Sequence, residues 1–148
     1  MRQRPRPRRQ VLYHFTSISH WPKIWQDGRL ALAESNVSRT ADHAGPDVVW
    51  LTTREAVGRG EIGLAGSAVD KSRVRFTVEV SAEKWFDFAG RYAVDRNWRN
   101  SLEAGNSPGT WRVTETEVGR DAWVEVRDMK TNQVLWEPGM AEPAFPLD

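Results

Sequence analysis

The chain of 148 residues contains no cysteine, so disulfides, thiolate zinc sites and a cysteine nucleophile are excluded. No segment approaches the roughly 20 consecutive apolar residues that span a membrane, and the N-terminus lacks the apolar centre of a signal peptide. The sequence also contains no GxGxxG motif, no Walker-type glycine-lysine pair, no internal repeat and no heptad pattern. We therefore expect a cytoplasmic protein that has no membrane partner.

Positive charge is concentrated at the start of the chain. The first ten residues contain five arginines, and since the whole chain carries +1, the remainder carries −4. Alternating arginine and proline favours an extended, solvated arm. One interpretation is a nucleic-acid contact, because arginine–phosphate contacts add sequence-independent affinity; it would use Arg4, Arg6, Arg8 and Arg9. The other interpretation is a disordered tail that only solubilises the protein.

Length and composition predict one domain with its own core. Hydrophobic residues make up 39% of the chain and charged residues 28%, as in ordinary globular proteins. Expected strands outnumber helices and do not alternate regularly with them, which favours an α+β fold. We divide the chain into a basic arm (1–10), a domain (11–137) and an irregular tail (138–148). The eight tryptophans either fill the core, as we expect of Trp85 and Trp136, or build a site from indole platforms.

The segment 11–30 reads as a buried strand, a turn and an amphipathic helix. The strand has apolar residues on both faces, so it belongs in the interior of a sheet. Ser17 or Ser19 is expected to cap the helix, Pro22 suits its first turn, and Gly28 ends it. The helix itself is predicted from an apolar stripe of residues three or four apart, Ile18, Trp21, Ile24 and Trp25.

The rest of the chain predicts mostly strands. A short helix is expected at 95–104 with Asp95 as its cap, and Trp85, Phe86 and Phe88 form a bulky apolar plug. Long polar or glycine-rich loops are expected at 33–47 and 54–70. The expected strands are 48–53, 73–81, 111–118, 123–127 and 134–136, the last at a sheet edge.

His14 is the first candidate for chemistry. A single histidine within a strand is more often structural than catalytic. However, Thr16 and Ser17 follow it at a strand-to-helix junction, where hydroxyls and free N–H groups can bind an anionic ligand. His20 and His43 are weaker candidates, and three histidines without an HExxH-like spacing argue against a metal site.

Three late glutamates form the second candidate set. Glu115 and Glu117 would share one face of the strand 111–118, and like charges so close raise a pKa, which suits acid–base chemistry. Alternatively, the strand leaves the core after Val113 and both carboxylates are solvated. Glu125 lies on the next expected strand. Thr52 is expected to pair with neighbouring backbone, and exposed arginines on strands, Arg75 and Arg112, would bind phosphates or nothing.

The stretch LYHFTSISHWPKIWQDGRL resembles the opening of DarT-type DNA ADP-ribosyltransferases. More distantly it resembles RNA 2′-phosphotransferases, which share the NAD-binding ADP-ribosyltransferase fold. The order of strand and helix, loop, VVWLTT, VRFTVEV and a late glutamate-bearing strand is also similar to that fold. The resemblance implies an α+β domain with split antiparallel sheets and a few short helices.

The resemblance also implies a function and residue roles. NAD would be consumed as a substrate, with transfer of ADP-ribose to nucleic acid or to a protein. His14 would bind the NAD ribose or the nicotinamide amide. Glu115, or behind it Glu117 or Glu125, would be the catalytic carboxylate. The other cofactor-binding residues would be Thr16, Ser17, Trp50 and Thr52, with Trp50 or Tyr92 stacking on nicotinamide.

Two alternatives remain beside the transferase. One is a module of the same fold without the chemistry, which binds nucleic acid or a partner protein; the arm and the tryptophans would suit single-stranded DNA or RNA. The other is an interaction domain in which His14 and the glutamates are structural. A pocket that joins His14 to Glu115 would favour catalysis, whereas side chains on opposite faces would favour binding.

Overall fold

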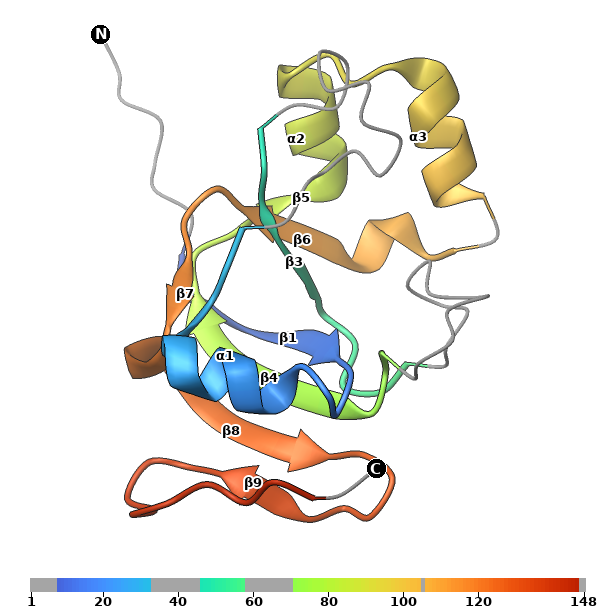
Figure 1. Ribbon diagram of the computed structural model, residues 1–148. Helices are drawn as coiled ribbons and strands as arrows, with labels where there is room; N and C mark the ends of the chain where they lie inside the picture. The colour runs from blue at the N-terminus through green and yellow to red at the C-terminus, as the bar shows by residue number, and fades with distance from the viewer. Residues whose placement is uncertain (1–7, 33–45, 58–70, 105, 147–148) are drawn as a thin grey trace, which may run out of the picture.

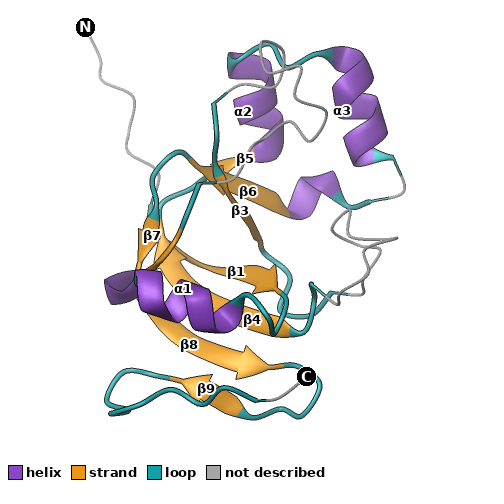
Figure 2. Cartoon of the chain, viewed as in Figure 1, coloured by secondary structure: helices purple, strands orange, loops and turns teal. Residues whose placement is uncertain are grey.

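A sheet of seven antiparallel strands forms the centre of the computed structural model, which describes residues 8–32, 46–57, 71–104 and 106–146. Figure 2 shows these elements along the chain. In chain order they are β1 (Gln10–Thr16), α1 (Trp21–Asp27), β2 (Arg29–Leu30), β3 (Val49–Thr52), β4 (Val74–Val80), β5 (Glu83–Lys84), α2 (Trp85–Arg91), α3 (Arg96–Glu103), η2 (Pro108–Thr110), β6 (Trp111–Thr114), β7 (Val118–Gly119), η3 (Arg120–Ala122), β8 (Trp123–Asp128) and β9 (Val134–Trp136).

The strand order of the large sheet is β5-β6-β3-β1-β4-β8-β9, and β2 and β7 form a separate two-stranded sheet. Every strand pair is antiparallel. This confirms the predicted α+β class. It also confirms that β1 is an interior strand, because it lies between β3 and β4, and that β9 is an edge strand.

Helices cover the two halves of the large sheet on opposite faces. Val49 and Leu51 of β3 belong to a first buried cluster together with Trp21 of α1. Their neighbour Val48 belongs instead to a second cluster, with Val113 of β6 and the α2 residues Trp85 and Phe88. Because successive side chains of a strand point to opposite faces, we name these the α1 face and the α2 face. Figure 1 shows α1 lying across β1 and β4, and α2 beside β5 and β6.

The opening unit folds as predicted except at the start of its helix, where Ile18, the first residue of the predicted stripe, lies in a turn before α1. Pro22 lies in the first turn of α1, and Gly28 ends the helix in the left-handed conformation with φ = 72°. The helix begins at Trp21 with His20 as its N-cap residue and without a side-chain cap, so the predicted cap from Ser17 or Ser19 is wrong. The reason is a turn between β1 and α1, in which the His20 N–H donates to the Ser17 carbonyl.

Two further predictions need correction. The bulky plug is part of a helix, α2, in which Trp85 and Phe88 are buried. The strand expected at 111–118 ends at Thr114, where the Thr114 hydroxyl accepts the N–H of Thr116 at 3.2 Å, and Val118 pairs with β2 instead. Glu115 and Glu117 are therefore exposed, as the solvated alternative predicted.

The remaining elements agree with prediction where the structure describes them. The expected strands at 48–53, 73–81, 123–127 and 134–136 are β3, β4, β8 and β9, and the short helix is α3. Most residues of the two loops expected at 33–47 and 54–70 lie outside the described residues. Arg4, Arg6 and His43 also lie outside them. Among the helices that the structure describes, none is both long and apolar enough to cross a lipid bilayer.

Candidate functional site

His14 lies where the large sheet opens. β1 pairs with β4 along its whole length, whereas its ladder with β3 consists of the pair Tyr13–Thr52. Figure 1 shows β3 turning away from β1 beyond that pair. Since His14 is the next residue of β1 and faces α1, its side chain stands at the start of the opening.

One hydrogen bond orients the His14 ring. Its Nδ1 lies 2.8 Å from the carbonyl oxygen of Trp50. Because a carbonyl oxygen only accepts, Nδ1 carries the hydrogen and donates it. Burial lowers the pKa of His14 below its ordinary value of 6.5, and the bond to Trp50 opposes this only in part, so the ring is neutral at pH 7. The lone pair of Nε2 is then an acceptor, with no partner among the described residues.

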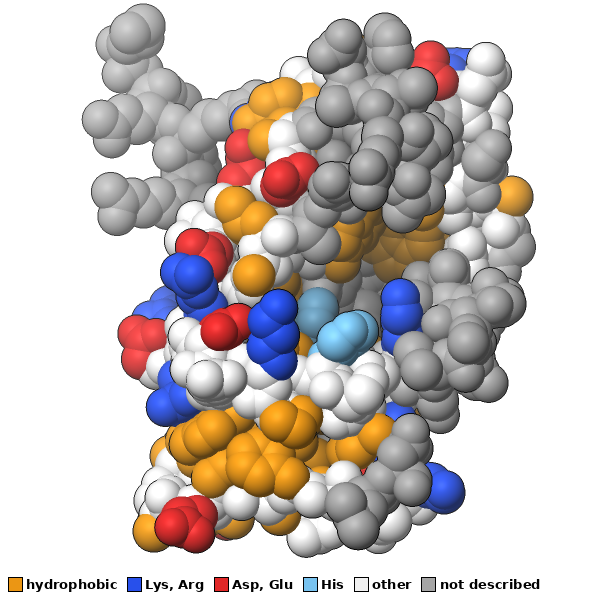
Figure 3. All heavy atoms as spheres, viewed as in Figure 1, with side chains coloured by type: hydrophobic (Ala, Val, Ile, Leu, Met, Phe, Trp, Pro, Cys, Tyr) orange, Lys and Arg blue, Asp and Glu red, His pale blue; other side chains and the backbone are white. Residues whose placement is uncertain are grey.

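Hydroxyl groups and a second histidine lie just beyond His14. Thr16 and Ser17 are buried at the end of β1. Ser17 Oγ lies 2.9 Å from Nδ1 of His20 and accepts the His20 N–H at 3.3 Å. Figure 3 shows the side chains of the described histidines next to one another in the middle of one face. The end of β1 therefore gathers His14, Ser17 and His20 into one polar group.

Trp50 and Thr52 direct their side chains away from this group. The Trp50 ring packs on the α2 face, with its centroid 5.0 Å from that of Trp85 and 5.8 Å from that of Trp111. The Thr52 hydroxyl lies 3.4 Å from that of Thr110 and accepts the N–H of Arg54, which is the backbone role expected of it. From β3, the His14 site therefore receives the backbone carbonyl of Trp50 and neither of the predicted side chains.

Glu115 is held on the α2 side of the sheet. Its Oε2 accepts from Arg91 Nη2 at 2.8 Å, and its Oε1 accepts from the Tyr92 hydroxyl at 2.7 Å. The hydrogen bond from Arg91 keeps the pKa of Glu115 below its ordinary value. Because both partners belong to or adjoin α2, Glu115 and His14 lie on opposite sides of the sheet. Tyr92, a candidate for stacking on nicotinamide, lies with Glu115.

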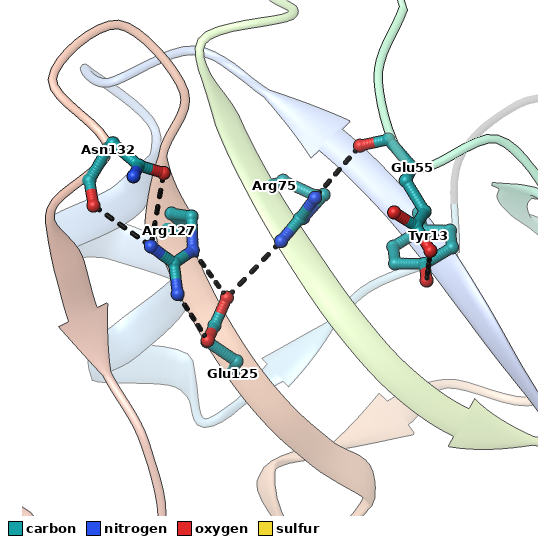
Figure 4. A network of polar contacts seen from close by, with 6 residues as sticks. All are labelled: Tyr13, Glu55, Arg75, Glu125, Arg127 and Asn132. Carbon is teal, nitrogen blue, oxygen red and sulfur yellow. Dashed lines mark hydrogen bonds and ion pairs between the residues drawn. The ribbon is translucent and has the colours of Figure 1, made fainter.

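Glu125 is occupied by two arginines on the face opposite to His14. Figure 4 shows its carboxylate between Arg127 and Arg75. Arg127 donates to both carboxylate oxygens at 2.8 Å, and Arg75 Nη2 donates at 3.3 Å. The bonds from Arg127 lower the pKa of Glu125 despite its partial burial. Since the adjacent Val126 belongs to the first cluster, Glu125 faces away from α1.

Glu117 lies beside the small β2–β7 sheet on the α1 side of the large sheet, with its side chain exposed, while that of the adjacent Val118 enters the first cluster. It precedes β7, whose partner β2 follows α1 directly. Leu30 of β2 and Val118 of β7 both belong to the first cluster, so this small sheet packs on the α1 face. Oε2 of Glu117 lies 2.9 Å from Nε of Arg29, and both side chains are about half exposed. The sequence ranked Glu117 second because nothing in it predicts that residues 88 positions apart meet in the β2–β7 pair.

The basic arm is attached at the opposite end of β1 from this polar group. Arg8 and Arg9 are exposed, and Arg9 Nη2 donates to the carbonyl oxygen of Glu79 at 3.0 Å. This bond fixes the base of the arm beside β4. The role of the arm in nucleic-acid binding stays a prediction.

Comparisons with protein families, with curated proteins and with solved structures give no match for this chain. Among the described residues, no group of three or more histidines and carboxylates could hold a metal ion. The residues around His14 are therefore the best candidates for function in the described part of the chain.

Proposed function

We propose that the protein is an NAD-consuming ADP-ribosyltransferase with an ADP-ribosyltransferase-like fold, and that it modifies nucleic acid or a protein. The observation that carries the proposal is the His14–Trp50 hydrogen bond at the point where β3 leaves β1. It presents a neutral imidazole, whose Nε2 has no partner in the described part of the chain, beside the hydroxyls of Thr16 and Ser17. The LYHFTS resemblance assigns His14 to the ribose or to the nicotinamide amide of NAD.

His14 would act as a binding residue in this reaction. Its Nε2 can accept a hydrogen bond from a ribose hydroxyl or from the nicotinamide amide. In the transfer, the bond from ribose C1′ to nicotinamide breaks with its electron pair leaving on nicotinamide. The acceptor atom then bonds to C1′ and loses its proton.

We propose Glu117, rather than Glu115, as the catalytic carboxylate. Positive charge develops on the ribose as nicotinamide leaves, and a carboxylate on the same side stabilises it. Glu115 is turned to α2 and Glu125 to the opposite face. Glu117, exposed on the α1 side and paired with the single cation Arg29, is available for that role.

The proposal is tested by calorimetry with NAD and by measuring nicotinamide release. We expect His14→Ala to abolish NAD binding and Glu117→Gln to reduce nicotinamide release about 100-fold or more while NAD still binds. Glu115→Gln is the matched control and should release nicotinamide at the wild-type rate. If Glu115→Gln is inactive and Glu117→Gln is not, the assignment of the carboxylate is wrong. If the wild type does not bind NAD at all, the transferase is ruled out.

The alternative is a module that binds nucleic acid or a partner protein without catalysis. The placement of Glu115 and His14 on opposite sides of the sheet favours it, because side chains on opposite faces were expected to favour binding over catalysis. A wild-type chain that binds an oligonucleotide but neither binds NAD nor releases nicotinamide would establish this alternative.

A further inference from the structure

Two cations lie side by side on the α1 face of β5 and β6. Trp111 and Val113 of β6 belong to the second cluster, on the α2 face, so Arg112 between them points to the α1 face. Lys84 is the direct cross-strand neighbour of Arg112. Glu83, the residue before Lys84, turns to the α2 side, where it forms an ion pair with α2. Lys84 and Arg112 therefore share one face.

This pair lacks the neutralisation that other strand arginines have. Like charges directly opposite each other in neighbouring strands, with Cβ atoms about 5 Å apart, repel. Among the described residues, no carboxylate forms an ion pair with Lys84 or Arg112, and Lys84 is exposed. Arg112 Nη1 donates to two backbone carbonyls, of Trp111 at 2.9 Å and Gly109 at 3.0 Å. Carbonyl oxygens satisfy a donor but do not cancel its charge, so the described part of the chain neutralises neither Lys84 nor Arg112.

Arg75 shows the contrasting case. It is also an arginine within a strand of the same sheet, but it donates to the carbonyl oxygen of Glu55 at 2.9 Å and pairs with Glu125 (Figure 4). Sequence reasoning treated Arg75 and Arg112 alike. The structure leaves Arg112, and not Arg75, without a carboxylate partner among the described residues.

The cation pair is close to the His14 site. Arg112 pairs with Leu51, which lies one residue before Thr52, the partner of Tyr13. Since His14 lies one residue after Tyr13, Arg112 is two strands away from it, and because β3 is leaving β1 there, the separation is about 10 Å or more. Figure 3 shows basic side chains on both sides of the histidines and a hollow beside them.

We propose that Lys84 and Arg112 bind backbone phosphates of a single-stranded nucleic acid that reaches the His14 site as the acceptor. The acceptor role rests on the proposed function, but the binding itself does not require NAD. β5 is an edge strand, so an extended polyanion can cross Lys84 and continue along the sheet.

The test is fluorescence anisotropy of a short labelled oligothymidine with the full chain over a series of salt concentrations. We expect Lys84→Gln and Arg112→Gln each to weaken binding about 3- to 10-fold and to reduce the salt slope by about 1. Arg112→Lys should keep the slope, because it keeps the charge. The matched control is Lys130→Gln, an exposed lysine after β8 near the other edge of the sheet, which should change neither quantity. Circular dichroism checks that every variant is folded.

The outcomes separate this inference from the transferase proposal. Wild-type affinity in both glutamine variants, or no binding by the wild type, overturns it. A fall in NAD affinity with unchanged oligonucleotide affinity also overturns it, because the phosphate bound would then be that of NAD. Loss of oligonucleotide affinity in a chain that does not bind NAD would support the phosphate contact while ruling out the transferase.

Discussion

The two halves of the sheet both bury a tryptophan at the centre of their cores, but they differ in how their charged side chains are paired. Buried tryptophans centre both halves, Trp21 in the first cluster and Trp85 in the second. In the α2 half, Arg91 pairs with both Glu83 and Glu115 on one surface. On the α1 side of the same strands, Lys84 and Arg112 have no such partners among the described residues. On these strands, ion-paired side chains thus lie on the α2 face, and the two cations without a carboxylate partner among the described residues lie on the α1 face.

This difference in the pairing of charged side chains indicates where an anionic ligand would bind. On the α2 side, carboxylates neutralise the positive charge in ion pairs, so little positive charge is left there to attract an anion. The α1 side combines an oriented histidine, buried hydroxyls and cations at the place where β1 and β3 separate. The site therefore belongs to the junction of the two halves rather than to either half.

The largest expected effect comes from removing the tryptophan at the centre of either cluster. Trp21 packs on Phe76 and donates from Nε1 to the Ala144 carbonyl at 2.8 Å, while Trp85 donates to Glu103 at 3.1 Å. We expect Trp21→Ala and Trp85→Ala each to lower the free energy of unfolding by about 3–5 kcal/mol, and Tm by roughly 10 °C. Calorimetry measures the loss.

Hydrogen exchange shows whether the halves are independent. If the halves unfold separately, Trp21→Ala will speed up the exchange of amide hydrogens in β4, and Trp85→Ala will speed up that of amide hydrogens in β6. Equally faster exchange in β4 and in β6 in both variants would mean that the sheet unfolds as one unit. The two halves would then differ in packing but not in stability.

The next effect concerns a buried ion pair in the α1 half. Arg73 Nη2 lies 3.1 Å from Asp128 Oδ2, and both side chains are buried. Burial raises the pKa of Asp128, but the bonds from Arg73 and from the N–H groups of Lys130 and Thr131 outweigh it and hold the pKa below 3.8. We expect Asp128→Asn to cost about 3 kcal/mol in unfolding free energy, because the buried Arg73 loses the carboxylate that neutralises its charge.

The pH dependence gives that prediction a second measurement. Since the folded pKa of Asp128 is lower than the unfolded one, its stabilisation is complete well above pH 3.8 and is lost as the pH falls through the folded pKa. Chemical denaturation of Asp128→Asn at several pH values should show a weaker loss below pH 3.8 than the wild type. If the stability of Asp128→Asn and of the wild type falls equally at acid pH, the acid-dependent loss does not come from Asp128. The double substitution Arg73→Met with Asp128→Leu should recover much of the stability.

The sequence predicted the local elements better than it predicted the faces on which they meet. The apolar stripe of α1, the alternation of β4 and the glycine that ends α1 depend on neighbours along the chain, and these predictions are confirmed. Trp85 and Trp136 were expected to fill the core and are buried. The strand 111–118 appeared continuous because its alternation is regular, but a side-chain bond at Thr114 ends it.

Of the candidate site, the sequence could identify the part near His14 only. Thr16 and Ser17 adjoin His14 in the chain, so their proximity follows from local structure. Whether Glu115, Glu117 or Glu125 faces His14 depends on pairings between distant strands. Periodicity says which residues share a face of one strand, but not which helix, distant in the chain, will cover that face. For the same reason the Lys84–Arg112 pair was not foreseen.

The smallest expected effect is at the bond that joins the two halves. His14→Phe keeps a ring beside Phe76, whose centroid lies 6.1 Å from that of His14, but removes the bond to Trp50. We expect a loss of about 1 kcal/mol in unfolding free energy at pH 8. Because the pKa of His14 is lower in the folded than in the unfolded chain, wild-type stability should fall as the pH drops below 6.5, and His14→Phe should lack that slope. Urea unfolding at pH 8 and at pH 5.5 measures both. A variant that keeps the wild-type slope would show that another group titrates there, and the neutral ring assigned to the site would no longer have support.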